Sequence, residues 1–220
     1  GTWLVSLQGG RVLRHRIDAL DAPPRVLGTC PEDAALRATP PGDLYLRVGP
    51  WRDRAVFSDA TGEVRIWDLP SATLARTLKS PADARCVALD PTGRYAATGP
   101  LDQGLRPRSM YLFDLAAPAV AEPLPLLASD MSYINDMRFS PDGAWLASVH
   151  GTIALLWNMS GSRSVVVGRA ELPVVAFADD GHLLSGAYDG VLRRWPLDPD
   201  SAEGIEELWS RPTVKITGLW

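Results

Sequence analysis

The 220-residue sequence is poor in cysteine and histidine and contains no long hydrophobic run. Its two cysteines, Cys30 and Cys86, are too few for a disulfide framework. Cys86 lies in the apolar stretch ARCVAL, so we predict a small buried core residue at this position. No apolar run approaches the roughly 18 residues that a transmembrane helix needs, and we therefore expect no membrane-spanning helix.

Lysine is scarce, and charge of one sign does not dominate. Lys79 and Lys215 stand against 20 arginines, which together with abundant alanine, proline and glycine indicates a GC-rich bacterial genome. The net charge is −4, and the 22% of charged residues mix both signs. A nucleic-acid-binding domain normally carries a basic face, and a helix that lies on a membrane surface is also basic. We therefore expect neither nucleic acid nor membrane as a partner, and a cytoplasmic location.

The short motifs of common enzymes are also missing. The three histidines, His15, His150 and His182, are not spaced as metal ligands, and neither cysteine belongs to a CxxC pattern. The sequence has no G-x-S-x-G elbow, no phosphate-binding glycine loop and no dinucleotide fingerprint. We therefore predict a non-enzymatic chain with no catalytic, cofactor-binding or metal-binding residues and no cofactor.

A tight-turn pattern, in contrast, recurs along the chain. Four segments combine an early proline or aspartate with a later glycine, and each follows a short apolar run: TPPGD at 39–43, DPTGR at 90–94, SPDGA at 140–144 and ADDGH at 178–182. Proline and aspartate favour the opening of a tight turn, and glycine tolerates the positive φ that such turns often need. The recurrence predicts a repeat protein.

A second pattern recurs independently of the turns. It consists of an aromatic residue inside the stretches IWDL, LFDL, LWNM and RWPL, at Trp67, Phe113, Trp157 and Trp195. The intervals between these aromatic residues are 46, 44 and 38 residues. A polar residue follows each of the first three, and an aspartate lies in the YDG turn before the fourth: Asp68, Asp114, Asn158 and Asp189. Upstream, GRVLRHRID at 10–18 aligns with GVLRRWPLD at 190–198 and places His15 where Trp195 stands.

The two patterns together define a repeating unit of four short strands. A predicted hairpin lies between each turn and its aromatic residue, and another β-like run follows. No convincing helical periodicity is present, so we predict an all-β fold. The complete units are expected at 34–80, 84–127, 132–168 and 172–209. Residues 1–30 are expected to form a partial unit, and residues 213–220 the first strand of a further or ring-closing unit.

A four-stranded meander of this length, with tryptophan and aspartate ending its third strand, resembles a blade of the WD-repeat β-propeller family. The resemblance implies a propeller of four-stranded antiparallel blades with about five repeat units here, as part of a larger propeller. It also implies that the repeated aromatic residues fill the wedge between adjacent blades. Ser185, Asp189 and Trp195 match three members of the family's buried hydrogen-bond network. The Gly-His pair that supplies its histidine is missing at the matching place, so we expect this network to be incomplete.

The remaining tryptophans fall into two groups. Trp3, Trp145 and Trp209 lie in strand-like runs, and we expect them to be buried. Trp51 lies in GPWRDR, one of two polar insertions, around 49–54 and 99–110. If both insertions extend the connection between second and third strands, they stand together on one face of the disc. We therefore predict a partner-binding patch composed of Trp51, Arg52, Arg54, Arg106 and Arg108, because tryptophan and arginine are enriched in interface hot spots.

These observations favour a non-catalytic protein–protein interaction scaffold that binds a protein or peptide. Bacterial WD-repeat arrays resemble sensor or regulatory domains of larger signalling or defence proteins, so other domains of a longer chain are further expected partners. The alternative is an enzymatic propeller, hydrolase-type or metal-dependent, with its site in the central channel. Such enzymes assemble their sites from dispersed strands, which leaves this alternative open.

Overall fold

The computed structural model describes residues 3–8, 11–29, 46–48, 54–58, 62–81, 84, 86–99, 109–118, 121–126, 134–151, 153–160, 164–169, 174–197 and 205–211. The regular elements in these residues are all strands, apart from one turn of 3-10 helix, η1 (Ile17–Ala19), and within each sheet a strand pairs antiparallel with the next along the chain. The prediction of an all-β fold of antiparallel meanders is therefore confirmed. Residues 213–220 and the TPPGD turn at 39–43 lie outside the described residues.

The strands form five sheets in chain order. The first sheet contains β1 (Trp3–Gln8), β2 (Arg11–Arg16) and β3 (Arg25–Thr29). The second contains β4 (Leu46–Val48), β5 (Arg54–Ser58), β6 (Glu63–Asp68) and β7 (Thr73–Lys79). The third contains β8 (Cys86–Leu89), β9 (Tyr95–Gly99), β10 (Met110–Asp114) and β11 (Leu124–Leu126). The fourth contains β12 (Ile134–Phe139), β13 (Trp145–His150), β14 (Ile153–Asn158) and β15 (Ser164–Arg169). The last contains β16 (Val174–Phe177), β17 (Leu183–Gly186), β18 (Val191–Trp195) and β19 (Glu206–Ser210).

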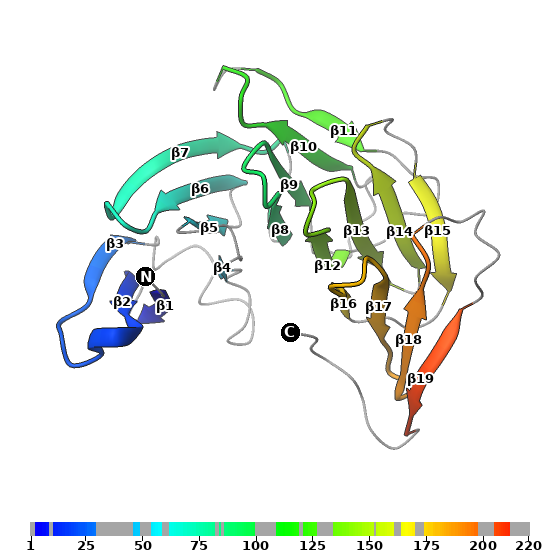
Figure 1. The fold of residues 1–220 in the computed structure, drawn as a ribbon. Helices are drawn as coiled ribbons and strands as arrows, with labels where there is room; N and C mark the ends of the chain where they lie inside the picture. Colours follow the sequence, from blue (N-terminus) through cyan, green and yellow to red (C-terminus); the bar gives the residue numbers. More distant parts are fainter. Residues whose placement is uncertain are drawn as a thin grey trace.

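The five sheets are arranged side by side in an open arc (Figure 1). In the four-stranded sheets the first strand lies towards the centre of the arc and the fourth strand lies at its outer edge (Figure 1). The sheet of β1 to β3 and the sheet of β16 to β19 stand at the two ends of the arc (Figure 1). The strands of the first sheet correspond to the second, third and fourth strands of the others, since β2 aligns with β18.

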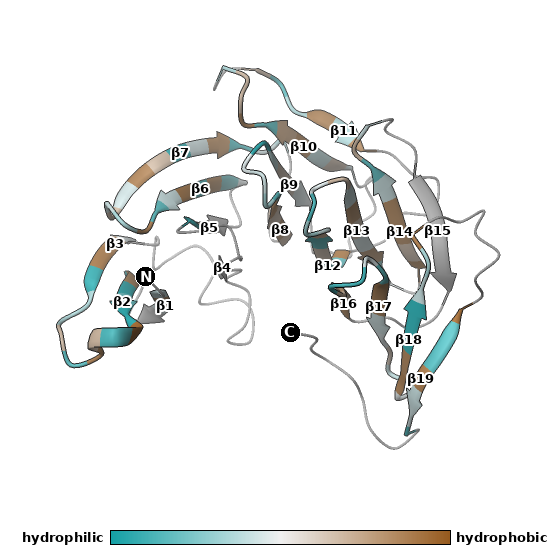
Figure 2. Ribbon diagram, viewed as in Figure 1, coloured by the Kyte–Doolittle hydropathy of each residue, from teal (hydrophilic) through white to brown (hydrophobic). Residues whose placement is uncertain are grey.

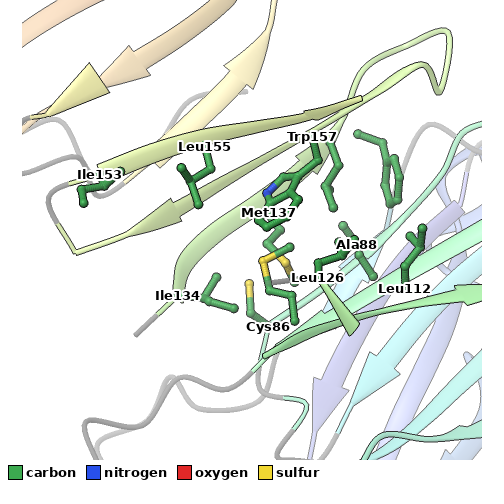
Figure 3. Close-up of a cluster of buried hydrophobic side chains, with 13 residues drawn as sticks. Cys86, Ala88, Leu112, Leu126, Ile134, Met137, Ile153, Leu155 and Trp157 are labelled. Atoms are coloured by element: carbon green, nitrogen blue, oxygen red, sulfur yellow. The ribbon is translucent and has the colours of Figure 1, made fainter. Parts of the chain in front are cut away.

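Four hydrophobic clusters hold the arc together, one between each pair of neighbouring sheets. The largest joins the third and fourth sheets, where Trp157 and Met137 of one pack with Cys86 and Leu112 of the other (Figure 3). Cys86 is fully buried there, as expected for a core residue.

Along the chain, β13 and β14 are mostly hydrophobic, whereas β18 and β19 include hydrophilic segments (Figure 2). Trp209 is 42% exposed on this outermost strand, although its strand-like sequence predicted burial, so that prediction was wrong.

Every one of these clusters is built from the same two kinds of sheet face. We define the aromatic face of a sheet as the one that carries its third-strand ring, and the receiving face as the opposite one. The aromatic face of the fourth sheet, with Trp157 and Leu155, packs on the receiving face of the third sheet, with Met110 and Leu112. The other three interfaces repeat this arrangement in the same direction along the chain.

Glycine closes the described turns between first and second strands. Gly93, Gly143 and Gly181 have φ of +79°, +72° and +82°, a region that side chains with a β-carbon rarely adopt. The amide of each donates a hydrogen bond to the carbonyl three residues earlier, at distances of 2.9 to 3.0 Å. The DPTGR, SPDGA and ADDGH segments therefore form the tight turns that their sequences suggest.

Candidate interaction surface

The repeated aromatic residues occupy equivalent places on the third strands. Trp157, Trp195 and Phe113 are buried with at most 6% of their surface exposed, each against the preceding sheet. Trp67 packs beside the first sheet, where a β-carbon placed on Gly28 would lie 2.7 Å from Cζ2 of its indole. Glycine at position 28 therefore makes room for this ring.

A serine on the second strand binds the indole in two sheets. The Nε1 groups of Trp157 and Trp195 donate to the Oγ atoms of Ser148 and Ser185, each at 2.8 Å. In both sheets the serine lies two residues after the residue that pairs with the tryptophan, so both point to the aromatic face. The bond satisfies the only polar atom of a buried indole.

The histidine of this network comes from a position that sequence reasoning missed. Oγ of Ser148 lies 2.8 Å from Nε2 of His150, two residues further along the same strand, and His150 is buried. The chain Trp157–Ser148–His150 therefore exists without a Gly-His pair. The sequence contains a signal for this contact in SVH, whose serine stands nine residues before Trp157. Because alternate residues of a strand share a face, the serine and the histidine of SVH point to the same side.

The aspartate predicted for the network of the last sheet makes different bonds. Oδ1 of Asp189 accepts from the amide of Val191 at 2.9 Å, and Oδ2 accepts from Arg193 at 2.8 Å. These bonds brace the turn between β17 and β18, and the guanidinium of Arg193 lowers the pKa of the Asp189 carboxyl. The structure thus joins Ser185 to Trp195, and Asp189 to its own hairpin.

Two other sheets place a polar pair at the same position as these serines. In the first sheet, Oγ of Ser6 lies 2.8 Å from Nε2 of His15, so this imidazole repeats the serine contact of the aligned Trp195. In the third sheet, Thr98 stands at the serine position, two residues after the Ala96 that pairs with Phe113, and its Oγ1 lies 3.2 Å from Oγ of Ser80. A serine or threonine therefore occupies this position in four of the five sheets, whereas Phe57 occupies it in the second.

The polar residues that follow the aromatic positions stabilise the turns into the fourth strands. Oδ1 of Asp68 accepts from the amide and hydroxyl of Ser71, and Oδ1 of Asn158 accepts the same two bonds from Ser160. Oδ1 of Asp114 accepts from the amide of Ala116. The side-chain hydrogen bond from Ser71 is the main reason that the pKa of Asp68 lies below its usual value.

Two turns between first and second strands, 90–94 and 140–144, touch each other, and Arg54 lies beside the first of them. A β-carbon on Gly143 would collide with Asp90 of the preceding turn and lie 3.1 Å from Cγ2 of Thr92. One on Gly93 would lie 3.5 Å from Nη1 of Arg54. We call these residues, Arg54 with the turns 90–94 and 140–144, the turn row.

Each turn of the row is fixed by its own hydrogen bonds. Oδ1 of Asp90 accepts from the amide of Thr92, while Oδ2 accepts from the Thr92 hydroxyl and the amides of Arg94 and Tyr95. Ser140 replaces this aspartate in the next turn, where its hydroxyl donates to Asp142 and accepts from the amide of Trp145. The bond from Ser140 lowers the pKa of Asp142.

The structure corrects the expected position of the two insertions. Residues 49–53 follow β4 and precede β5, so they join first and second strands, whereas 100–109 lie between β9 and β10, the second and third strands. Arg54 begins its second strand and Gly99 ends the equivalent one, so the insertions attach at opposite faces of the arc. Arg54, in the turn row, is exposed. Trp51, Arg52, Arg106 and Arg108 lie outside the described residues.

Comparison with known proteins agrees with the geometry of the sheets. Residues 125–158 match the family model described as WD domain, G-beta repeat. The fold is that of a WD-repeat β-propeller. The resemblance inferred from the turns and aromatic residues is therefore confirmed. The matched WD repeat ends on Trp157 and Asn158, the aromatic residue and its turn acceptor.

The structure resembles solved structures even where the sequence identity is low. A chain in "Crystal Structure of Mitotic Checkpoint Complex" matches with a TM-score of 0.63 at 16% sequence identity. The match covers 86% of this chain and 56% of that chain, so the WD-repeat arc spans little more than half of its length. In all, 1211 chains of solved structures match, and a fold so widely shared does not by itself select a function. No curated protein matches the sequence.

Neither a metal-ligand cluster nor a membrane-spanning helix is found among the described residues of the WD-repeat arc. Within them, no cluster of three or more histidine, cysteine, aspartate or glutamate side chains is placed to hold a metal ion. Nor does any helix of this part of the chain have the length and hydrophobicity to cross a membrane.

Proposed function

We propose that the chain is a non-catalytic scaffold that binds a protein or peptide, as the sensor or regulatory propeller of a larger bacterial signalling or defence protein. The WD-repeat propeller fold fits such a role, and proteins with this fold are typically non-enzymatic. The observation that carries the proposal is the turn row. Three successive sheets present turns, or a strand start, that touch one another and are fixed by local hydrogen bonds.

The chemistry of the turn row suits a polar partner segment. Arg54, Thr92, Arg94 and Asp142 are exposed along it, so both signs of charge and a hydroxyl are offered together. Arginine binds carboxylates in a planar two-bond geometry, which suits an acidic stretch of a protein. Because the turns are already ordered, binding would cost little conformational entropy.

The test reverses the charge of the two arginines in the turn row. The double variant Arg54→Glu, Arg94→Glu should lose partners that the wild-type chain captures from its source cells. Arg11→Glu is the matched control, because Arg11 is also exposed but begins β2, at the opposite face of the arc. Capture by the double variant at the wild-type level, with both proteins folded, would refute the turn row as the binding surface.

The predicted patch can be tested in two parts, because its residues belong to two different insertions. Trp51→Ala with Arg52→Ala alters the insertion that joins β5 at Arg54, and Arg106→Ala with Arg108→Ala alters the insertion that follows β9 at Gly99. Loss of the partner in the first pair only would assign binding to the turn-row face. Loss in the second pair only would assign it to the opposite face and remove the turn row from the proposal.

A further inference from the structure

The side chain of Arg76 reaches from the second sheet to a turn of the third. Arg76 lies on β7, and its Nη1 and Nη2 donate to the carbonyls of Leu115 and Ala117, the second of these bonds at 2.6 Å. Both carbonyls belong to the turn 114–117, which follows the third strand β10. A guanidinium presents its donors in a rigid, planar fork, so two bonds to one turn fix both the position and the orientation of that turn.

The turn 114–117 also has hydrogen bonds of its own. The amide of Ala117 donates to the carbonyl of Asp114 at 3.2 Å, and the amide of Ala116 donates to Oδ1 of Asp114 at 2.9 Å. These bonds lie within the turn and determine its shape. Arg76 adds the attachment of the turn to the second sheet.

The same turn is bonded to Arg94 of the turn row. The amide of Leu115 donates to the carbonyl of Arg94 at 2.6 Å. Oδ2 of Asp114 lies 3.8 Å from Nη2 of Arg94, so the side chains of the two residues also attract each other. Leu115 therefore accepts from Arg76 through its carbonyl and donates to Arg94 through its amide.

The fourth sheet repeats the backbone part of this connection. The amide of Met159 donates to the carbonyl of Ala144 at 2.9 Å, as the amide of Leu115 does to the carbonyl of Arg94. In both sheets the donor stands two residues after the aromatic position, and the acceptor directly follows the turn glycine. The bond between the two kinds of turn is thus common to the third and fourth sheets.

The third sheet has a leucine at the position that Arg76 occupies in the second. Arg76 pairs with Ile66, the residue before the aromatic position of its sheet. The same position in the third sheet is Leu112, which pairs with Leu124. Because leucine has no hydrogen-bond donor in its side chain, Leu124 cannot hold the turn 158–160 of the fourth sheet in this way.

A second arginine holds a turn of the second sheet. Arg14 of the first sheet is 8% exposed, and its Nη1 donates to the carbonyl of Pro70 at 2.8 Å. Pro70 lies in the turn after β6, which ends at Asp68, and Asp68 pairs across the strands with Arg54 of the turn row. Both arginines of the turn row, Arg54 and Arg94, therefore lie beside a turn that an arginine of the preceding sheet holds.

We propose that Arg76 is a positioning residue of the turn row: it holds the turn 114–117 and thereby fixes the place of Arg94 relative to Arg54. A binding group that is ordered before the partner arrives loses less conformational entropy on binding. Arg76 acts through Leu115 and does not itself contact the partner. The consequence for binding rests on the proposed function, whereas the positioning of Arg94 is a property of the chain alone.

The test measures amide hydrogen exchange at single residues by NMR in Arg76→Met. Methionine keeps an unbranched side chain but removes both donors. The amides of Leu115 and of residues 92–95 should exchange about tenfold faster, because their local opening no longer has to break the bonds from Arg76. The amides of Met159 and of residues 143–145 should keep their wild-type rates, since their turns have no bond to Arg76.

A second readout follows the side chain of Arg94, which a purely structural role of Arg76 would not affect. Nitrogen relaxation of the Arg94 Nε–H group should show larger motion in Arg76→Met than in the wild type. Arg76→Lys should restore part of the order, because an ammonium group can still donate to one of the two carbonyls. The matched control is Leu124→Met, at the corresponding position of the third sheet, and it should leave both readouts unchanged.

Three results would overturn the proposal. They are wild-type exchange at residues 92–95 in Arg76→Met, an equal increase of exchange in all five sheets, and the same added motion of Arg94 in the control variant. The capture experiment with the charge-reversed turn row is a separate test. If that experiment refutes the binding surface, the exchange result still decides whether Arg76 positions Arg94.

Discussion

The fourth and last sheets are built on the same motif but meet different surroundings. In each, a third-strand tryptophan donates to a second-strand serine, Trp157 to Ser148 and Trp195 to Ser185, both at 2.8 Å. The fourth sheet packs on a neighbour at both faces, and every residue from Ile153 to Trp157 is buried. Among the described residues the last sheet packs at one face, and every residue of its outer strand β19 is exposed.

The comparison shows which features depend on the strand motif and which depend on the neighbouring sheets. The indole–serine bond is the same in both sheets, so it depends on the register of two adjacent strands. The receiving face changes with its environment, because Leu156 before Trp157 is buried, whereas Arg194 before Trp195 holds two carboxylates. A repeat of this kind can therefore keep its indole–serine bond while its receiving face carries polar side chains.

The largest effect should come from removing the two tryptophans. Trp157→Ala should lower the free energy of unfolding by about 3 to 5 kcal/mol, because it leaves a cavity in the largest core cluster. Trp195→Ala should cost less of the global stability, since it weakens one interface at the end of the arc. Chemical denaturation measures the total, and hydrogen exchange shows where the protection is lost.

The exchange pattern decides whether the sheets behave as neighbours in a row. Trp157→Ala should reduce amide protection in the third, fourth and last sheets together, whereas Trp195→Ala should reduce it in the last sheet alone. Equal loss across all sheets in both variants would show that the arc unfolds as one unit.

Much of this fold could be predicted because its signals are local. The turn glycines Gly93, Gly143 and Gly181 and the ring positions recur in sequence, and each depends only on its own turn or strand pair. The all-β meander and the propeller resemblance followed from these few positions. His150 is not indicated by the family pattern, which places the histidine after a glycine, whereas strand alternation brings His150 to the same face as Ser148.

The features that depend on other sheets could not be read from the sequence. Trp209 has the sequence of a buried strand residue, and only the position of β19 at the end of the arc explains its exposure. Arg14 donates to a carbonyl 56 residues further along the chain, and Arg76 donates to one 39 residues further along. No local sequence pattern indicates either partner. Likewise, the place of residues 49–53 between first and second strands required knowing where β4 lies.

The turn glycines allow a second comparison between the two sheets. Gly143 and Gly181 share a positive φ, so an alanine at either position should cost about 1 to 2 kcal/mol in backbone strain. At Gly143 the new methyl group would also collide with Asp90 of the neighbouring turn, whereas at Gly181 nothing lies within 4 Å. Gly143→Ala should therefore be the more destabilising in thermal denaturation, and equal losses would show that the turns yield to the collision.

The two serines allow a last comparison, in which Ser185→Ala has the smallest expected effect. Ser185→Ala removes the one bond to the Trp195 indole and should cost about 1 kcal/mol, near the net value of a single hydrogen bond. Ser148→Ala breaks the contacts to both Trp157 and His150 inside a buried sheet and should cost about 2 to 3 kcal/mol, because a buried polar group that loses its partner keeps its full desolvation penalty. Adding Trp157→Phe to Ser148→Ala should restore part of the loss, since phenylalanine has no donor to satisfy. A double variant less stable than Ser148→Ala would mean that the volume of the indole, and not its hydrogen bond, dominates at this position.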